Sequence, residues 1–373
     1  MKRARPRTYV GWVVVPALSI LLALLVASVL IIASGLIDQE KRFDLLLPLV
    51  AYGSLLEGAF GSVRGFANMI VAATPLMLTG LAVGVGLKAG LFNIGATGQV
   101  LLGGFAAALV GVTVADASPF AAIPLAMLGG ILAGALAGFI PGFLKAYTGA
   151  HEVVTTIMLN AIIQLAVSGL VNDVFRAPGF SFARTASVGN ATLIGAGNTT
   201  LHVGVLFAII CIPLSYWLLW RTTVGFEIRA VGANPTAALY AGMKPRRMMI
   251  LTMSLCGAFA GLAGAIEILR LGYYPAVFGT SIGFDGITVA LLGQANPIGI
   301  MLSAFLLGAM RAGAPLMQIE AGVPVEIIDV IQGVILIFLA AEIVVRRIFR
   351  LRTAQGAGEL QTITRTYGEK VAG

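Results

Sequence analysis

Long apolar runs dominate this chain, and the segments between them carry too little charge to cover a soluble protein. Only 11% of the residues are charged, whereas a soluble domain carries roughly 25%. A spanning helix needs about 20 predominantly apolar residues. The apolar runs lie at residues 12–34, 72–90, 98–115, 120–144, 152–171, 203–220, 247–268, 283–294, 297–314 and 325–345. The pattern therefore predicts an all-α membrane protein with about ten transmembrane helices.

Three segments break the pattern of a simple helical bundle: the long polar stretch 221–247 and two short segments beside apolar runs. The first short segment is GLFNIGATGQ at residues 90–99, in which three glycines, Asn93 and Gln99 separate two apolar runs. The second is the run at 283–294, which as a helix would be about 18 Å long and cannot cross a core of roughly 30 Å. Irregular backbone is tolerated at membrane depth only where it is buried in protein or lines a cavity. Both short segments therefore predict broken or partial helices, although composition leaves a plain tight turn at 90–99 open.

The remaining segments outside the apolar runs have simpler interpretations. Residues 44–62 are apolar but contain a proline and a glutamate, which favours an interfacial or re-entrant helix. The loop at 172–202 is rich in Gly, Ser and Thr and has no clear periodicity. We expect one transmembrane domain over residues 1–352 and a disordered cytoplasmic tail at 353–373.

The distribution of Lys and Arg predicts an orientation. If the N-terminus is cytoplasmic, seventeen of the 24 basic residues fall on the cytoplasmic side and seven on the other. This imbalance follows the positive-inside rule. It explains the net charge of +8 without nucleic-acid binding. We expect a multi-pass protein of a bacterial cytoplasmic membrane with both termini in the cytoplasm.

Acidic residues near the spans are candidates for ion coupling or for the wall of a pathway, because charge inside a bilayer is costly. For three of them a structural role is favoured. Glu267 precedes Arg270 by three residues and predicts an ion pair. Glu326 and Asp329 lie near the start of the last span, where a helix N-terminus favours negative charge. Asp285, at the mouth of the short run, is the best pathway candidate.

The histidines do not indicate a metal or proton site. His151 and Glu152 together predict the start of a helix, and His202 a boundary between a loop and a span. No group of side chains has metal-ligand spacing. The sequence also has no G-x-x-x-x-G-K-[ST] phosphate loop. We expect no cofactor in this chain and no enzymatic activity of its own.

Four ordered motifs resemble those of the permease subunits of ABC importers for nucleosides and simple sugars, a branched-chain amino acid and ribose-like family. They are GLFNIGATGQVLLGG at 90–104, GAHEVVTTIMLN at 149–160, GFEIRAVGANPTAALYAGM at 225–243 and FDGITVALLGQANPIG at 284–299. The family usually has Glu where this chain has Thr97, so any role of that Glu is unsupported here. The N-I-G-A-x-G-Q version is similar to the nucleoside branch, whereas the sugar branch carries an acidic-L-S-V-G pattern.

The resemblance implies a type II ABC importer-like permease that moves nucleosides or related small polar solutes inward. The partners it implies are an ABC ATPase subunit holding ATP and Mg, a second permease subunit, identical or different, and an extracytoplasmic solute-binding protein. Membrane lipid surrounds the complex. The alternatives are a simple-sugar permease and, from a different class, an ion-coupled secondary transporter that works alone.

Four residues are the candidates for the substrate pathway. An aromatic side chain and two amides, Phe92, Asn93 and Gln99, are suited to stack on and hydrogen-bond a nucleobase or a sugar. Asp285 is suited to accept hydrogen bonds from ribose hydroxyls.

The polar stretch 221–247 is the candidate for ATPase coupling. Asn234 and Pro235 predict a helix start, and Ala237, Ala238, Tyr240 and Ala241 predict a small, flat docking face. Glu227 and Arg229 are predicted as surface charges, and a solvated connector is the alternative. The candidate coupling residues are Gly225, Glu227, Arg229, Gly232, Asn234, Ala238 and Gly242.

Overall fold

The chain folds almost entirely into helices. The computed structural model describes residues 7–37, 45–195, 197, 199–278 and 281–341. Within these ranges there are 13 α-helices, one short 3-10 turn and isolated β-bridges only, which confirms the all-α prediction. The predicted tail at 353–373 lies outside the described residues.

Eight helices are long and apolar enough to cross a membrane. They are α1 (Arg7–Ile37), α3 (Val63–Lys88), α4 (Ala96–Thr113), α5 (Pro119–Thr148), α6 (Glu152–Asp173), α7 (Gly204–Arg221), α10 (Pro245–Leu271) and α12 (Pro297–Ala321). Three shorter apolar helices accompany them, namely α2 (Leu47–Phe60), α11 (Ser281–Leu292) and α13 (Ile327–Ala340). Each of the ten predicted runs falls on one of these helices.

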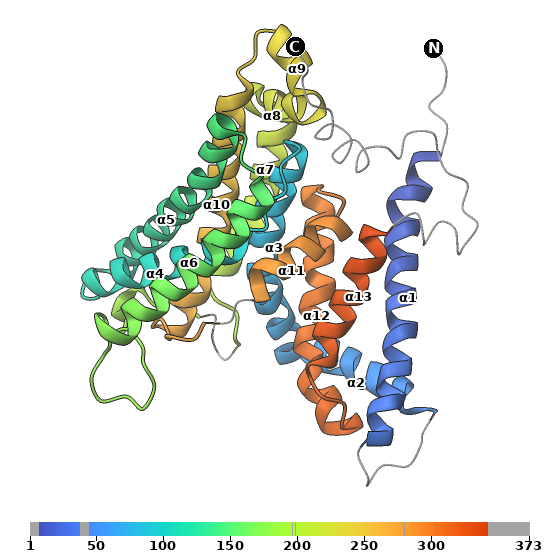
Figure 1. Ribbon diagram of the computed structural model, residues 1–373. Coiled ribbons are helices and arrows are strands. Elements are labelled where there is room, and N and C mark those ends of the chain that lie inside the picture. The colour runs from blue at the N-terminus through green and yellow to red at the C-terminus, as the bar shows by residue number, and fades with distance from the viewer. Residues whose placement is uncertain (1–6, 38–44, 196, 198, 279–280, 342–373) are drawn as a thin grey trace.

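The helices form two groups joined by α3 (Figure 1). In one group α10 packs between α4 and α5, and α6 runs along their outer side. In the other group α12 packs on α2 and α3, and α1 packs on α13. The small helices α8 (Thr223–Ala233) and α9 (Pro235–Tyr240) lie at the end of the molecule where α1 begins (Figure 1).

Glycines let α4, α5 and α10 pack backbone to backbone. A Cβ added at Gly134 would lie 2.3 Å from the carbonyl oxygen of Gly257, and one at Gly103 would lie 2.3 Å from the Cα of Gly261. Small residues at helix interfaces are typical of membrane proteins, because lipid offers no hydrophobic drive for helix association and close packing replaces it.

Helix α3 begins nine residues before the predicted run at 72–90, at Val63. Arg64 and Asn68 lower the hydropathy of its first turns, so the apolar run does not include this part of the helix. The Ser62 side chain accepts a hydrogen bond from the Gly65 backbone N–H at 2.9 Å and so caps the helix. Serine at this position is a recognisable helix start.

The short run predicted at 283–294 is a partial helix, α11, as expected. Gln294 and Ala295 follow it with φ of 53° and 52°. Non-glycine residues seldom adopt such angles, so the chain turns sharply there. The Asn296 side chain then accepts from the Ile298 N–H at 3.0 Å and starts α12.

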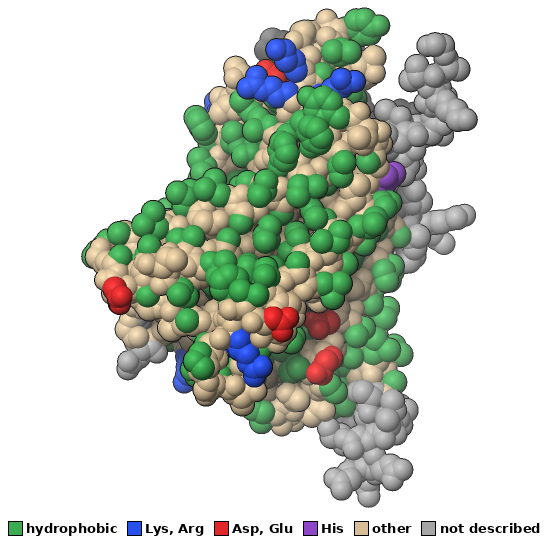
Figure 2. All heavy atoms as spheres, turned by 60° about the vertical axis from the view of Figure 1, so that its left-hand side comes forward, with side chains coloured by type: hydrophobic (Ala, Val, Ile, Leu, Met, Phe, Trp, Pro, Cys, Tyr) green, Lys and Arg blue, Asp and Glu red, His purple; other side chains and the backbone are tan. Residues whose placement is uncertain are grey.

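The surface supports a membrane position for the middle of the molecule. Figure 2 shows hydrophobic and other uncharged side chains over the middle of the α5–α6 face. Lys and Arg gather toward the end that bears α8 and α9, and most of the visible Asp and Glu lie toward the opposite end. An uncharged band between two charged ends is the pattern that a bilayer requires.

The charged residues near the spans lie where the sequence predicts them. Glu267 and Arg270 form an ion pair one turn apart on α10. Asp329 lies in the first turn of α13. Glu152 is the first residue of α6 and pairs with Lys145 of α5, with 2.8 Å between Oε2 and Nζ. These two side chains are only 6% and 10% exposed, so the ion pair holds the α5–α6 turn closed.

His202 lies two residues before α7, as predicted, and is 7% exposed. Burial, and then the Arg270 charge, lower its pKa from 6.5 to about 4, against a smaller opposing effect of Glu267. The unfolded chain therefore binds a proton at this residue at higher pH than the folded chain does.

We expect the stability of the protein to fall as the pH drops from about 6.5 to about 4, by roughly 2–3 kcal/mol from this residue. Thermal unfolding in detergent across this range measures the slope. His202→Gln removes the titrating group and should flatten the curve. An unchanged slope in the variant would refute the assignment.

Candidate solute pathway and coupling site

The turn between α3 and α4 is buried and held together by two amide side chains. Asn93 and Gln99 are 0% and 1% exposed. The Asn93 Nδ2 donates to Gln99 Oε1 at 2.9 Å, and the Gln99 Nε2 donates to Asn93 Oδ1 at 3.1 Å. Asn93 Oδ1 also accepts from the Gly95 N–H at 3.1 Å. The pair satisfies polar groups that would otherwise be buried without partners.

A third amide fastens this turn to α6. The Asn160 Oδ1 accepts from the Gly98 N–H at 2.8 Å, and its Nδ2 donates to the Ile94 carbonyl oxygen at 2.9 Å. An unpaired N–H at the start of α4 and an unpaired carbonyl of the turn are thus both satisfied. Sequence analysis did not single out Asn160, although it ends the motif GAHEVVTTIMLN, where an amide interrupts an apolar span.

The two broken segments predicted from the sequence meet each other. A Cβ added at Gly283, near the start of α11, would lie 2.3 Å from the backbone nitrogen of Thr97. Thr97 is 4% exposed and lies in the first turn of α4. The residue that departs from the family pattern therefore lies at the contact between the two broken helices.

The predicted pathway residues occupy different surroundings. Asn93 and Gln99 hydrogen-bond each other inside the protein, and Phe92 beside them is half-buried. Asp285 is half-buried on α11 and forms an ion pair with Arg311 of α12, which the sequence analysis missed. An arginine within an apolar run needs an acidic partner. Arg311 in the run at 297–314 was therefore the sequence feature that could have predicted this ion pair. Contact of these four residues with solute remains a prediction.

The stretch 221–247 contains two helices, of which only the second was predicted. Asn234 caps α9, with its Oδ1 accepting from the Ala237 N–H at 2.9 Å, as expected for Asn before Pro. Gly242 follows with φ of 83°, which ends the element. Helix α8 was missed because its composition is mixed. Thr222 caps it by accepting from the Gly225 N–H at 3.0 Å.

Helix α8 packs directly on the end of α3 and the buried turn. A Cβ added at Gly232 would lie 2.2 Å from the Lys88 carbonyl oxygen and 2.8 Å from the Cα of Ala89. Gly90, with φ of 70°, lies against Gly232 from the other side of this contact. A separate apolar core surrounds it and includes Val85, Ala89, Leu91, Ile228, Val231 and Ala238.

Several predicted coupling residues hold α8 and α9 onto the protein instead of facing outward. Gly225 packs against the Leu218 carbonyl, where a Cβ would lie 2.0 Å away. Arg229, predicted as a surface charge, is half-buried and donates from Nε to the Leu219 carbonyl at 3.0 Å. Ala238 is 4% exposed, so it does not belong to the predicted outward face. Glu227 is half-buried.

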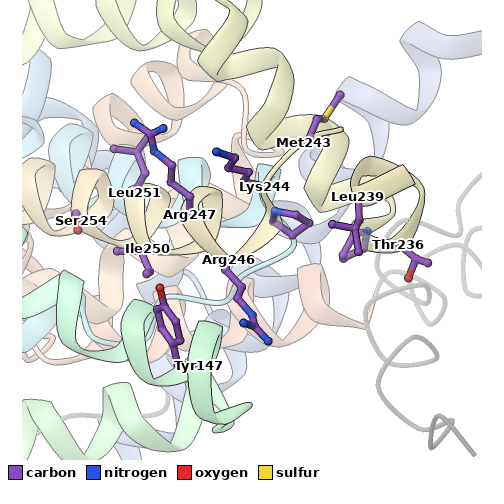
Figure 3. A pocket seen from close by; sticks show the side chains of 12 residues that line it. Tyr147, Thr236, Leu239, Met243, Lys244, Arg246, Arg247, Ile250, Leu251 and Ser254 are labelled. Carbon is purple, nitrogen blue, oxygen red and sulfur yellow. The ribbon is translucent and has the colours of Figure 1, made fainter. Parts of the chain in front are cut away.

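The outward face of this element is aromatic and aliphatic. Tyr240 is 87% exposed, Leu239 60% and Phe226 55%. A groove of about 940 Å³ lies beside α9 and the start of α10. Its basic side chains are Lys244, Arg246 and Arg247, and its wall includes Tyr147, Met243 and Ile250 (Figure 3). Its lining contains no acidic residue.

These features define a multi-pass membrane protein with broken helices at its centre and a short helical element packed on them at one end. The chain belongs to the family of permease components of branched-chain amino acid transport systems, whose family model matches residues 65–340. It is an ABC permease and not itself an ATPase, as predicted.

Named relatives cover almost the whole chain. The guanosine ABC transporter permease NupP of Bacillus subtilis is 38% identical, over 92% of this chain and 97% of the relative. The nucleoside ABC transporter permease NupB of Lactococcus lactis is 34% identical, over 96% and 98%. The glucose ABC transporter permease TsgB13 of Haloferax volcanii is 32% identical, over 89% of each chain. No solved structure gives a significant match.

Proposed function

We propose that this chain is the membrane-spanning permease subunit of an ABC importer that takes up nucleosides. The observation that carries the proposal is the contact of Gly232 with Lys88 and Ala89, which joins the α8–α9 element to the turn at the broken helices. A partner that moves α8 therefore moves this turn. The domain over residues 1–352 provides the pathway, and the coupling stretch 221–247 receives the conformational change of the ATPase.

The choice of nucleosides is supported by the relatives and by the pathway candidates. Two of the relatives above are named for guanosine or nucleosides, at 38% and 34% identity. Phe92, Asn93, Gln99 and Asp285 combine a ring, amides and a carboxylate, which suit a base and a ribose. The amides of Asn93 and Gln99 reach solute when the α3–α4 turn opens during transport. A simple sugar is the second candidate, supported by the glucose permease.

The partners follow from the two ends of the molecule. The end with α8 and α9 faces the cytoplasm of a bacterium, where an ATPase holding ATP and Mg docks on Leu239 and Tyr240. The groove with Arg246 and Arg247 receives apolar and acidic side chains of that ATPase. The opposite end receives the solute-binding protein, and a second permease subunit, identical or related, completes the pathway. Both termini lie in the cytoplasm.

The proposal is tested by reconstituting the chain in liposomes with its ATPase and binding protein and by measuring uptake of radiolabelled guanosine. We expect uptake that needs ATP and stops when the ATPase carries an inactivating substitution at its catalytic carboxylate. Ribose and glucose serve as the competing solutes. Accumulation of guanosine by the chain alone under an ion gradient would refute the proposal and support a secondary transporter.

A further inference from the structure

Helix α6 carries polar side chains that lipid would not tolerate. Its buried positions, among them Asn160, Ile163 and Val167, recur at helical spacing and form one stripe packed on α4 and α5. Gln164 lies near the middle of this spanning helix, beside that stripe, and is exposed. It has no hydrogen-bond partner among the residues that the structure describes. An amide at membrane depth faces water or a polar partner, because hydrocarbon leaves it unsatisfied.

Gln164 faces a small hollow with a mixed lining. The hollow has a volume of about 90 Å³, and Ser168, one turn further along α6, also lines it. Tyr274 and Phe278, from the segment after α10, line another part of it, with their ring centroids 5.5 Å apart. Leu101 contributes from α4, two residues after Gln99. The hollow therefore lies just beyond the buried amide turn on the same helix.

The lining has the chemistry that recognises a flat heterocycle. The face of Phe278, which is half-buried, is suited to stack on a ring, and the Gln164 amide is suited to donate to or accept from the edge of a base. The volume is that of about three water molecules at roughly 30 Å³ each. It admits the edge of a ring.

We propose that Gln164, Ser168 and Phe278 form a solute-binding station on the transport pathway, in which Gln164 hydrogen-bonds the base. The proposal rests on the nucleoside uptake proposed above and deepens it. It places the α6 flank with Gln164 on the aqueous path. The opposite flank, which carries Ile162, 58% exposed, faces away from that path.

Accessibility tests the position without any transport. Gln164→Cys and Ile162→Cys are made separately in the full chain, and the complete importer is treated with a membrane-impermeant thiol reagent. The native Cys211 and Cys256 are 9% and 0% exposed, so the parent chain supplies the background. We expect the cysteine at position 164 to react with the reagent and guanosine to protect it. We expect the cysteine at position 162 to stay unmodified. An unreactive position 164 would overturn the proposal even where the importer is fully active.

Kinetics test the role in binding. Gln164→Ala should raise the KM for guanosine by about threefold to tenfold, the equivalent of one lost hydrogen bond to solute. Gln164→Asn, which keeps an amide, should restore part of the affinity. Ile162→Ala, the matched truncation on the opposite flank, should leave KM unchanged. Equal KM values for wild type and Gln164→Ala would overturn this station and leave the proposed uptake standing, whereas absence of guanosine uptake in the wild type would refute the uptake itself.

Discussion

Gly232→Leu is expected to abolish most transport while the membrane bundle stays folded. The new side chain has no room, because even a Cβ would lie 2.2 Å from the Lys88 carbonyl oxygen. Helix α8 must therefore move away from the turn at residues 88–90. Overpacking of this kind costs on the order of 1–3 kcal/mol. Because the cost falls on only one of the two transport states, it shifts the equilibrium between them. The shift lowers uptake by on the order of tenfold to a hundredfold.

Three quantities are measured: ATP-driven uptake, the thermal stability of the detergent-solubilised chain, and the amount of ATPase that co-purifies with it. We expect uptake to fall while the thermal midpoint changes by only a few degrees. Gly169→Leu is the matched control, since no atom lies within 4 Å of a Cβ at Gly169. Normal uptake by Gly232→Leu would contradict both the tight contact and its role in coupling.

Asn93→Leu is expected to destabilise the protein strongly. The substitution leaves the Gln99 amide, 1% exposed, without its partner, and it removes the acceptor of the Gly95 N–H. A buried polar group without a partner costs about 1–3 kcal/mol, so two such groups give a loss of roughly 2–6 kcal/mol. Chemical unfolding in detergent measures the change, and expression in the membrane is expected to fall with it.

A double-mutant cycle separates this mechanism from a simple loss of packing. Gln99→Leu alone is also expected to be costly, but in the Asn93→Leu background it removes a group that is already unsatisfied, so the double variant costs less than the sum. Gln318→Leu, at an exposed position near the end of α12, is the control for replacing an amide by leucine and should be nearly neutral. Strictly additive effects of Asn93→Leu and Gln99→Leu would show that the amide pair does not form.

The elements that sequence analysis missed share a physical cause. Helix α8 and the first turns of α3 have mixed composition, and their helical state depends on caps at Thr222 and Ser62 and on packing against neighbours. Hydropathy detects burial in lipid and is insensitive to such segments. The hydrogen bond of Arg229 could not be foreseen, because its partner, the Leu219 carbonyl, lies ten residues away on another helix.

Sequence patterns identify the segments that form the site, but they do not show how those segments are arranged in space. Asn93 and Gln99 were identified from one loop, and the structure pairs them with each other. Asn160 bonds the backbone of Gly98 and Ile94 in the same turn, which lie 62 and 66 positions away in the chain. No local pattern contains such a distance, so only the fold shows which of several amides meet.

The membrane class, the helical fold and the partial helix at 283–294 followed from the sequence alone. The physical reason is that lipid leaves a backbone few options, so apolar length, scarce charge and glycine-rich interruptions each have one main consequence. Which segments meet was decided by tertiary packing, because contacts such as Gly232 with Lys88 and Gly283 with Thr97 need two surfaces without side chains at the same place. Close approach of two backbones depends on the positions of both, and neither segment encodes the position of the other.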